Sequence, residues 1–232
     1  MILPADQAHH LRDVLRLQVG DAIDLFDDAG QSAQGRLVIS QPLNVSVEIA
    51  DIHPAQLTTT ISVASAVPKG DRADWMIEKL SEIGVTRFIP LKTDRSVVHP
   101  EGRAKLDRWR RIAIESAKQC RRVGVMGIEE LRDLRDCVMP AASSPGESHR
   151  LFLDTGSGAG QLITVTRNLQ KLRSVELFIG PAGGWTGDEI SRFLAAGLTG
   201  VSLTTTILRI ETAAVIAAGV IACSFDREDP FP

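Results

Sequence analysis

The chain has 232 residues, a formal net charge of −3 and a hydrophobic fraction of 44%, which is typical of one large or two small globular domains. Met1–Asp6 carries no basic residue, and the longest apolar stretch, Ala213–Cys223, is far shorter than the ~20 residues that span a bilayer. We therefore expect no membrane segment. Cys120, Cys137 and Cys223 are widely spaced, so we expect a cytoplasmic protein with reduced thiols, no disulfide framework and no metal.

Residues 21–57 alternate short apolar segments with turn signals. Arg36-Leu37-Val38-Ile39 and Asn44–Ile49 have the composition of strands, and Asp27-Asp28-Ala29-Gly30 and Gln41-Pro42 interrupt them. This pattern predicts a small β-barrel. Pro54-Ala55-Gln56 marks the expected linker, so we predict one domain over residues 1–57 and a second over residues 58–232.

Beyond this linker, apolar runs alternate with helical patterns, which predicts an α/β domain with a largely parallel sheet. The predicted strands are 60–66, 85–91, 151–153, 175–179 and 201–203, and the predicted helices are 74–83, 103–120, 162–172, 188–196 and 211–224. Residues 136–149, rich in Ala, Ser, Pro and Gly, are predicted to form a surface loop.

The first of these helices shows two kinds of side chain. Trp75, Met76, Leu80 and Ile83 have helical spacing and are predicted to be core positions. The charged residues Glu78, Lys79 and Glu82 indicate a solvated, ion-paired face rather than a pair of catalytic carboxylates.

A basic patch falls on the second predicted helix. Eight basic side chains face two acidic ones between residues 103 and 122, a local net charge of +6. Such a patch neutralises phosphates and favours RNA as a partner. The alternative is a solvated helix face paired with acidic residues elsewhere, such as Glu129, Glu130 and Asp133.

Two loops near the C-terminus indicate a site for a nucleotide-like ligand. Leu177–Glu189 combines an apolar strand, a glycine-rich turn and a helix opened by the capping box Thr186-x-x-Glu189. Ile207–Ala214 repeats this arrangement, with Glu211 in the first helical turn, where its charge suits the positive helix end. Backbone amides exposed at two such loops can hold one ligand between them.

A third glycine-rich segment, Leu153–Gly160, fits the D-x-G-x-G-x-G loop of Rossmann-like methyltransferases. A Rossmann-like fold needs several further strand–helix units after this loop, and the remaining chain is short. We therefore favour a plain glycine loop at a strand end.

Seven motifs follow one another in the order of a known family. They are His10-Leu11-x-x-Val14-Leu15-Arg16, Lys69-Gly70-Asp71-Arg72, Glu78-Lys79 with Glu82 and Gly84, Asp94-Arg95-Ser96-Val97, Ala117-Lys118-Gln119-Cys120, Ile179–Gly184 and Leu208–Ala214. Over nearly the whole chain they resemble the RsmE-type ribosomal RNA (uracil-N3) methyltransferases, which belong to the trefoil-knotted SPOUT superfamily.

This resemblance implies a C-terminal SPOUT α/β knot domain and an N-terminal PUA-like β-barrel. It also implies S-adenosylmethionine as cofactor, a homodimer packed through the knot helices, and methylation of N3 of a uridine in 16S ribosomal RNA of the 30S subunit. The cofactor-binding residues that it implies are Leu153, Ile179, Gly180, Pro181, Gly183, Gly184, Ser202, Leu203, Leu208, Thr212 and Ala213.

Methylation at uracil N3 requires the loss of the N3 proton. A cation beside a uracil oxygen would stabilise the resulting anion, and Arg209 is the candidate. Glu211 is the candidate proton acceptor, with helix capping or cofactor contact as the alternative. Arg95 and Gln119 are candidate substrate or cofactor contacts. The further predicted RNA contacts are His10, Arg12, Arg16, Arg72, Arg108, Arg110, Arg111 and Arg122.

Two departures from the family pattern leave alternatives open. Ala182 stands where the family usually has Glu, and Ile210 where it usually has Thr. One alternative is a dimeric RNA-binding protein that has lost catalysis. The other is a knotted methyltransferase that acts on another RNA position, such as a ribose 2′-hydroxyl.

Overall fold

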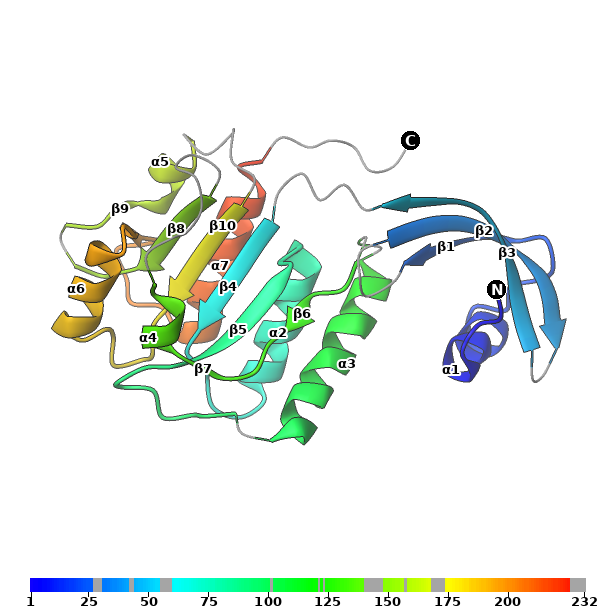
Figure 1. The fold of residues 1–232 in the computed structure, drawn as a ribbon, viewed down its shortest axis with the longest axis horizontal. Helices are drawn as coiled ribbons and strands as arrows, with labels where there is room; N and C mark the ends of the chain where they lie inside the picture. Colours follow the sequence, from blue (N-terminus) through cyan, green and yellow to red (C-terminus); the bar gives the residue numbers. More distant parts are fainter. Residues whose placement is uncertain are drawn as a thin grey trace. The chain divides into compact units, whose positions relative to one another are not determined.

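A computed structural model describes residues 1–26, 31–41, 44–54, 60–100, 102–120, 122, 124–139, 148–156, 158–167 and 174–225 (Figure 1). The chain divides into two units, Met1–Gln56 with Val123–Val125, and Leu57–Arg122 with Met126–Pro232. The predicted turns at 27–30 and 42, linker residues 55 and 56, Arg121, loop residues 140–147 and helix residues 168–172 lie outside the described residues.

The first unit is built on an antiparallel sheet in the order β1-β2-β3. Its strands are β1 (Ala22–Phe26), β2 (Gln31–Gln41) and β3 (Asn44–Pro54), preceded by a short α1 (Ala5–His9) and one π-helical turn, η1 (His10–Val14). A glycine is required at the irregularity after Gln34, because a Cβ on Gly35 would lie 2.5 Å from Cγ1 of Val47. The unit has a small hydrophobic core, formed by Leu3, Ala8, Ile23, Leu37, Val45 and Val47. Within the described residues, the predicted small β-barrel takes the form of a three-stranded antiparallel sheet.

The second unit contains a sheet in the order β6-β5-β4-β10-β8-β11-β9, with β7 paired to β5. Every neighbouring pair is parallel. The predicted α/β domain with a parallel sheet is therefore confirmed. The strands are β4 (Thr60–Ser65), β5 (Arg87–Lys92), β6 (Gly127–Ile128), β7 (Arg132–Asp133), β8 (Ser148–Leu153), β9 (Gly160–Gln161), β10 (Ser174–Ile179) and β11 (Thr199–Ser202).

Helices α2 and α7 pack against each other, and α7 also contacts β4 and β10; Figure 1 shows α7 behind these two strands and α2 behind β5. The helices of this unit are α2 (Arg72–Ile83), α3 (Arg103–Gln119), α4 (Leu134–Cys137), α5 (Leu162–Thr166), α6 (Gly187–Ala195) and α7 (Ile210–Ala222). The predicted loop 136–149 is wrong at both ends. Asp133 caps α4 by accepting a hydrogen bond from the Arg135 amide, and β8 begins at Ser148.

One of the core positions predicted on helix α2 is wrong. Met76 and Leu80 are fully buried, whereas Trp75 is 44% exposed. The buried stripe of α2 follows the spacing of Ala73, Met76, Ile77 and Leu80, and Trp75 falls outside it at 100° per residue. The predicted ion-paired face is confirmed, because Nζ of Lys79 lies 2.8 Å from Glu78 and 2.7 Å from Glu82.

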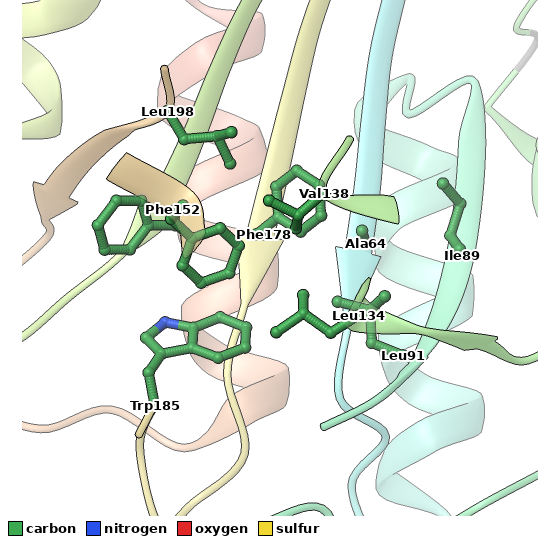
Figure 2. Close-up of a cluster of buried hydrophobic side chains, with 10 residues drawn as sticks. Ala64, Ile89, Leu91, Leu134, Val138, Phe152, Phe178, Trp185 and Leu198 are labelled. Atoms are coloured by element: carbon green, nitrogen blue, oxygen red, sulfur yellow. The ribbon is translucent and has the colours of Figure 1, made fainter. Parts of the chain in front are cut away.

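An aromatic cluster connects the sheet to the loop that follows β10. The ring of Phe152 is stacked on that of Phe193 at 4.6 Å, and the Trp185 ring meets Phe193 edge-on at 4.8 Å. Figure 2 shows Trp185 beside Phe152 and Phe178 within the buried cluster. The indole Nε1 of Trp185 donates a 2.7 Å hydrogen bond to the Leu153 carbonyl, so its polar atom is satisfied. This packing fixes the start of α6 against the strand ends.

Candidate active site

The carboxyl ends of β8, β10 and β11 lie at one edge of the sheet because these neighbouring strands are parallel. The loops that follow them surround a cavity of about 390 Å³, here called the first cavity. Its lining residues are Arg95, Leu153, Asp154, Thr155, Ile179, Gly180, Pro181, Ala182, Gly183, Gly184, Trp185, Ile190, Val201, Leu203, Thr204, Thr206, Ile207, Leu208 and Ile210. The wall combines aliphatic side chains with the backbone of the glycine-rich loop.

The loop between β10 and α6 is held by its own hydrogen bonds. Thr186 Oγ1 accepts from the Glu189 amide at 3.3 Å, and Glu189 Oε2 accepts from the Thr186 amide at 2.7 Å, which is the predicted capping box. Gly184 takes a left-handed conformation with φ 69°. Gly180 makes room for Trp185, because a Cβ there would lie 2.9 Å from Cε2 of the indole.

A second cavity of about 200 Å³ adjoins the first. It is lined by residues 66–69 at the end of β4, Arg72 of α2, residues 95–98 after β5, and Arg209, Ile210 and Glu211 at the start of α7. Arg95, Pro181, Ala182, Gly183 and Ile210 line both cavities. Ligands bound in the two cavities would therefore be neighbours, because the same residues border both.

Charge in the second cavity is mostly positive. Lys69, Arg72, Arg95 and Arg209 line it together with one carboxylate, that of Glu211. The Glu211 side chain is only 8% exposed, and its Oε1 lies 3.5 Å from NH1 of Arg72. A buried carboxylate depends on such a partner. The arrangement places a proton acceptor among cations that can stabilise a developing anion.

Most predicted site residues meet at these two cavities. Leu153, Ile179, Gly180, Pro181, Gly183, Gly184, Leu203 and Leu208 line the first cavity, and Arg72, Arg95, Arg209 and Glu211 line the second.

Three predicted cofactor residues, Ser202, Thr212 and Ala213, are not lining residues of either cavity. The hydroxyl of Ser202 turns instead to the carbonyls of Ala159 and Gly160, at 3.5 and 3.3 Å. Thr212 and Ala213 follow Glu211 on α7, and each step along a helix rotates the side chain by 100°.

Several lining residues were not predicted. Lys69 belongs to one of the seven family motifs but had no predicted role. Ile207 is 83% exposed at the first cavity; it belongs to the predicted ligand loop Ile207–Ala214 but had no predicted role of its own. Asp154 and Thr155 were predicted only as part of a glycine loop, which forms a turn through the 3.1 Å bond from the Gly156 amide to Asp154 Oδ1. Neither Gly156 nor Gly158 lines this cavity, which favours the plain glycine loop over the Rossmann alternative.

The basic helix α3 is partly neutralised by its own neighbours. Arg108 contacts Asp74 at 2.6 Å, Arg110 contacts Asp107 at 2.7 Å, and both arginine side chains stay about half exposed or more. Arg122 differs, because it donates to the carbonyls of Ser81 and Val85 at 2.9 and 2.7 Å. Burial lowers the pKa of this guanidinium. Its structural bonds argue against the predicted RNA contact, whereas Gln119 is exposed and Arg111 remains accessible.

The predicted RNA contacts of the first unit lie in and just after η1. His10 is half-buried, and Arg16 is exposed with a left-handed backbone, φ 54°. Arg12 pairs with Asp13 at 2.6 Å, and its hydrogen bond is the main cause that lowers the pKa of Asp13 to about 2. Their role in RNA binding stays a prediction.

Comparison with known proteins agrees with this geometry. Residues 55–222 match the model of an RNA methyltransferase domain, and residues 3–50 match that of an RNA methyltransferase PUA domain. The ribosomal RNA small subunit methyltransferase E of Synechocystis is 31% identical, over 94% of this chain and 71% of the relative. The chain belongs to the RNA methyltransferase family. Its Bacillus subtilis relative of the same name is 27% identical, over 95% of this chain and 88% of the relative.

Members of this family have solved structures with the same fold. The ribosomal RNA small subunit methyltransferase E of Neisseria gonorrhoeae, bound to S-adenosyl methionine, superposes with a TM-score of 0.80 at 26% identity, covering 97% of this chain and 92% of that one. A probable rRNA-methyltransferase of Porphyromonas gingivalis superposes with a TM-score of 0.80 at 29% identity, covering 96% and 92%. The expected SPOUT-type domain with its PUA partner is thereby confirmed.

Two further observations concern the described ranges alone. No helix in them is long and apolar enough to cross a membrane. They contain no group of three or more His, Cys, Asp or Glu side chains placed to hold a metal ion.

Proposed function

We propose that this protein transfers a methyl group from S-adenosylmethionine to N3 of a uridine in 16S ribosomal RNA of the small subunit. The observation that carries the proposal is the shared wall of the two cavities, formed by Pro181, Ala182 and Gly183. A methyl donor in the first cavity and a base in the second would be neighbours. Holding two reactants in this way supplies a large part of the rate enhancement in a transfer reaction.

The residues of the first cavity fit S-adenosylmethionine. At about 390 Å³ the cavity falls within the ~300–1,000 Å³ that is usual for small-molecule sites. Ile179, Leu203, Leu208 and Ile210 offer an apolar surface to a purine ring, and the backbone of residues 180–184 offers polar groups to its edges. When bound, this cofactor supplies the methyl group on a sulfonium that is already a good leaving group.

The chain itself must align the base and handle one proton. Arg209, exposed at the start of α7, is positioned to stabilise negative charge on a uracil oxygen. Glu211 would accept the N3 proton, and Arg72 would hold that carboxylate in place. Lys69 adds a further cation to the same cavity. In this scheme the substrate base is bound most strongly in its ionised form.

RNA affinity would come from residues outside the two cavities. The proposed contacts are Arg108, Arg110, Arg111 and Gln119 on α3, together with His10, Arg12 and Arg16 of the domain that we assign to residues 1–57. The partner is the 30S subunit, and the proposed location is the cytoplasm. Residues 58–232 would form the methyltransferase domain.

A homodimer is also proposed. Helices α2 and α7 pack side by side, and both expose large apolar side chains, with Trp75 44% and Ile216 39% exposed. A second copy of the chain that packed on α2 and α7 would cover both side chains.

Nucleoside mass spectrometry tests the reaction. Purified protein is incubated with 30S subunits from a strain that lacks the gene, and the product nucleosides are measured. We expect 3-methyluridine to appear only with S-adenosylmethionine present. A ribose-methylated nucleoside would identify another target position. RNA binding without any methylated product would instead favour a binding protein that has lost catalysis.

A further inference from the structure

Arg95 links the loop after β5 to the loop between β10 and α6, residues 180–186, here called the cofactor loop. Its NH1 donates a 2.7 Å hydrogen bond to the Gly183 carbonyl, and a longer one of 3.4 Å to the Trp185 carbonyl. The aliphatic part of the same side chain lies against Gly183, since a Cβ built on that glycine would be 3.4 Å from Cδ of Arg95. The guanidinium is thus engaged by the protein backbone.

The residue before Arg95 holds the other end of the same loop. The Asp94 amide donates to Oε1 of Glu189 at 2.9 Å, and Oδ2 of Asp94 accepts from the Thr186 hydroxyl at 3.1 Å. Glu189 is only 4% exposed and also accepts from the Thr186 amide. Two consecutive residues therefore hold the whole segment from Gly183 to Glu189.

The loop that carries both residues is itself braced. The Thr93 amide donates to Oγ of Ser96 at 3.0 Å, and that hydroxyl donates back to the Thr93 carbonyl at 3.0 Å. Thr93 is 7% exposed and directly follows β5. Strand β5 therefore fixes the position of this turn and, with it, the position of Arg95.

We propose that Arg95 is a positioning residue that sets the shape of the wall between the two cavities, rather than a phosphate contact. This inference rests on the proposed function. Arg95 lines both cavities, and its hydrogen bonds orient the carbonyls of Gly183 and Trp185 on that wall. Loss of these bonds would release the Gly183 end of the loop, while Asp94 would keep the Thr186 end in place.

The test compares Arg95→Met with Arg95→Lys and with the control Arg192→Met, an exposed arginine on α6 outside the lining of both cavities. S-adenosylmethionine affinity is measured by calorimetry without RNA, and single-turnover methylation with saturating cofactor. We expect Arg95→Met to weaken cofactor binding tenfold or more and to slow transfer by a similar factor. Arg95→Lys should recover only part of both losses, because the lysine side chain ends one bond short of the position of NH1, the nitrogen that donates to both carbonyls.

The salt dependence of RNA binding separates positioning from phosphate contact. A lost phosphate contact would lower the slope of log K against log salt by roughly 0.7 to 0.9. We expect Arg95→Met, Arg192→Met and the wild-type protein to have equal slopes. A reduced slope with unchanged cofactor affinity would overturn the inference, and so would full recovery by Arg95→Lys. Failure of the wild-type protein to bind the cofactor would instead refute the proposed function.

Discussion

Arg72 and Glu211 lie 139 positions apart in the chain, yet NH1 of the arginine is 3.5 Å from Oε1 of the glutamate in the second cavity. The pair joins the first turn of α2 to the first turn of α7, two helices that pack side by side. Glu211 is thereby fixed beside the cations that surround the proposed substrate base.

Replacement of Glu211 tests its role as proton acceptor. We expect Glu211→Gln, which keeps the shape of the side chain, to slow single-turnover methylation by roughly 10² to 10⁴ at neutral pH. The rate should recover as pH rises, because solvent then removes the N3 proton. The matched control is Glu115→Gln on the exposed side of α3. A rate and pH profile equal to wild type would leave Glu211 with a structural role only.

Arg209 is expected to act on the transition state rather than on cofactor binding. For Arg209→Ala we expect cofactor affinity within about tenfold of wild type, roughly 1.4 kcal/mol, and methyl transfer slower by about 10² or more. Calorimetry and single-turnover kinetics measure the two effects separately. If the rate is unchanged, Arg209 has no part in the mechanism.

Helix α3 provides a test of RNA contact that leaves the fold intact. Arg108 is unsuitable, because Asp74 accepts from both Arg108 and the Trp109 indole and a glutamate would repel it. The double change Arg110→Gln and Arg111→Gln removes two charges without placing a carboxylate beside Asp107, and it should weaken RNA binding and reduce its salt slope by roughly 1.4 to 1.8. Arg167→Gln with Arg192→Gln makes the same change of net charge elsewhere. Equal slopes for the two double variants would return α3 to a solvated surface.

Substitution of one glycine in each loop tests whether the cofactor binds at the cofactor loop or at the glycine loop after β8. In Gly183→Val the new side chain would press on Arg95, whose Cδ lies 3.4 Å from where the added Cβ would stand, and we expect at least a tenfold loss of cofactor affinity. Gly158 has no heavy atom within 4 Å of such a Cβ, so Gly158→Val should cost much less. Both variants must first show a wild-type melting temperature and oligomeric state. The reverse order of effects would place the cofactor at the glycine loop after β8.

Cysteine reactivity follows burial. Burial raises the pKa of the Cys137 thiol to about 11, so at pH 8 only roughly one thiol in a thousand is ionised. Cys120 and Cys223 are exposed. With limited iodoacetamide at pH 8, peptide mass spectrometry should find these two alkylated well before Cys137. Equal rates would show that the Cys137 side chain is accessible in solution.

Local patterns in the sequence were sufficient to predict helices α2, α6 and α7 and the glycine-rich loop at the first cavity. Hydrophobic periodicity and capping residues act over one or two turns, so α2, α6 and α7 begin within two residues of their predicted starts and the Thr186–Glu189 capping box forms as expected. The resemblance in motif order added the family, because the same residue types recur at the same loops. Charge on α3 was equally visible, but its partners were not.

Tertiary structure decided which of these residues meet. The packing of α7 against α2 and β4 brings Lys69, Arg72 and Glu211 into one cavity, and nothing within a short window of sequence specifies that packing. For the same reason the backbone acceptors of Arg95 and Arg122 could not be predicted from the sequence. Trp75 was wrongly predicted to be buried, and the Ser202 hydroxyl turns to the carbonyls of Ala159 and Gly160, because short-range sequence patterns do not fix the direction in which a side chain faces. That direction depends on packing between segments distant in the chain, where the free energy of burial is gained.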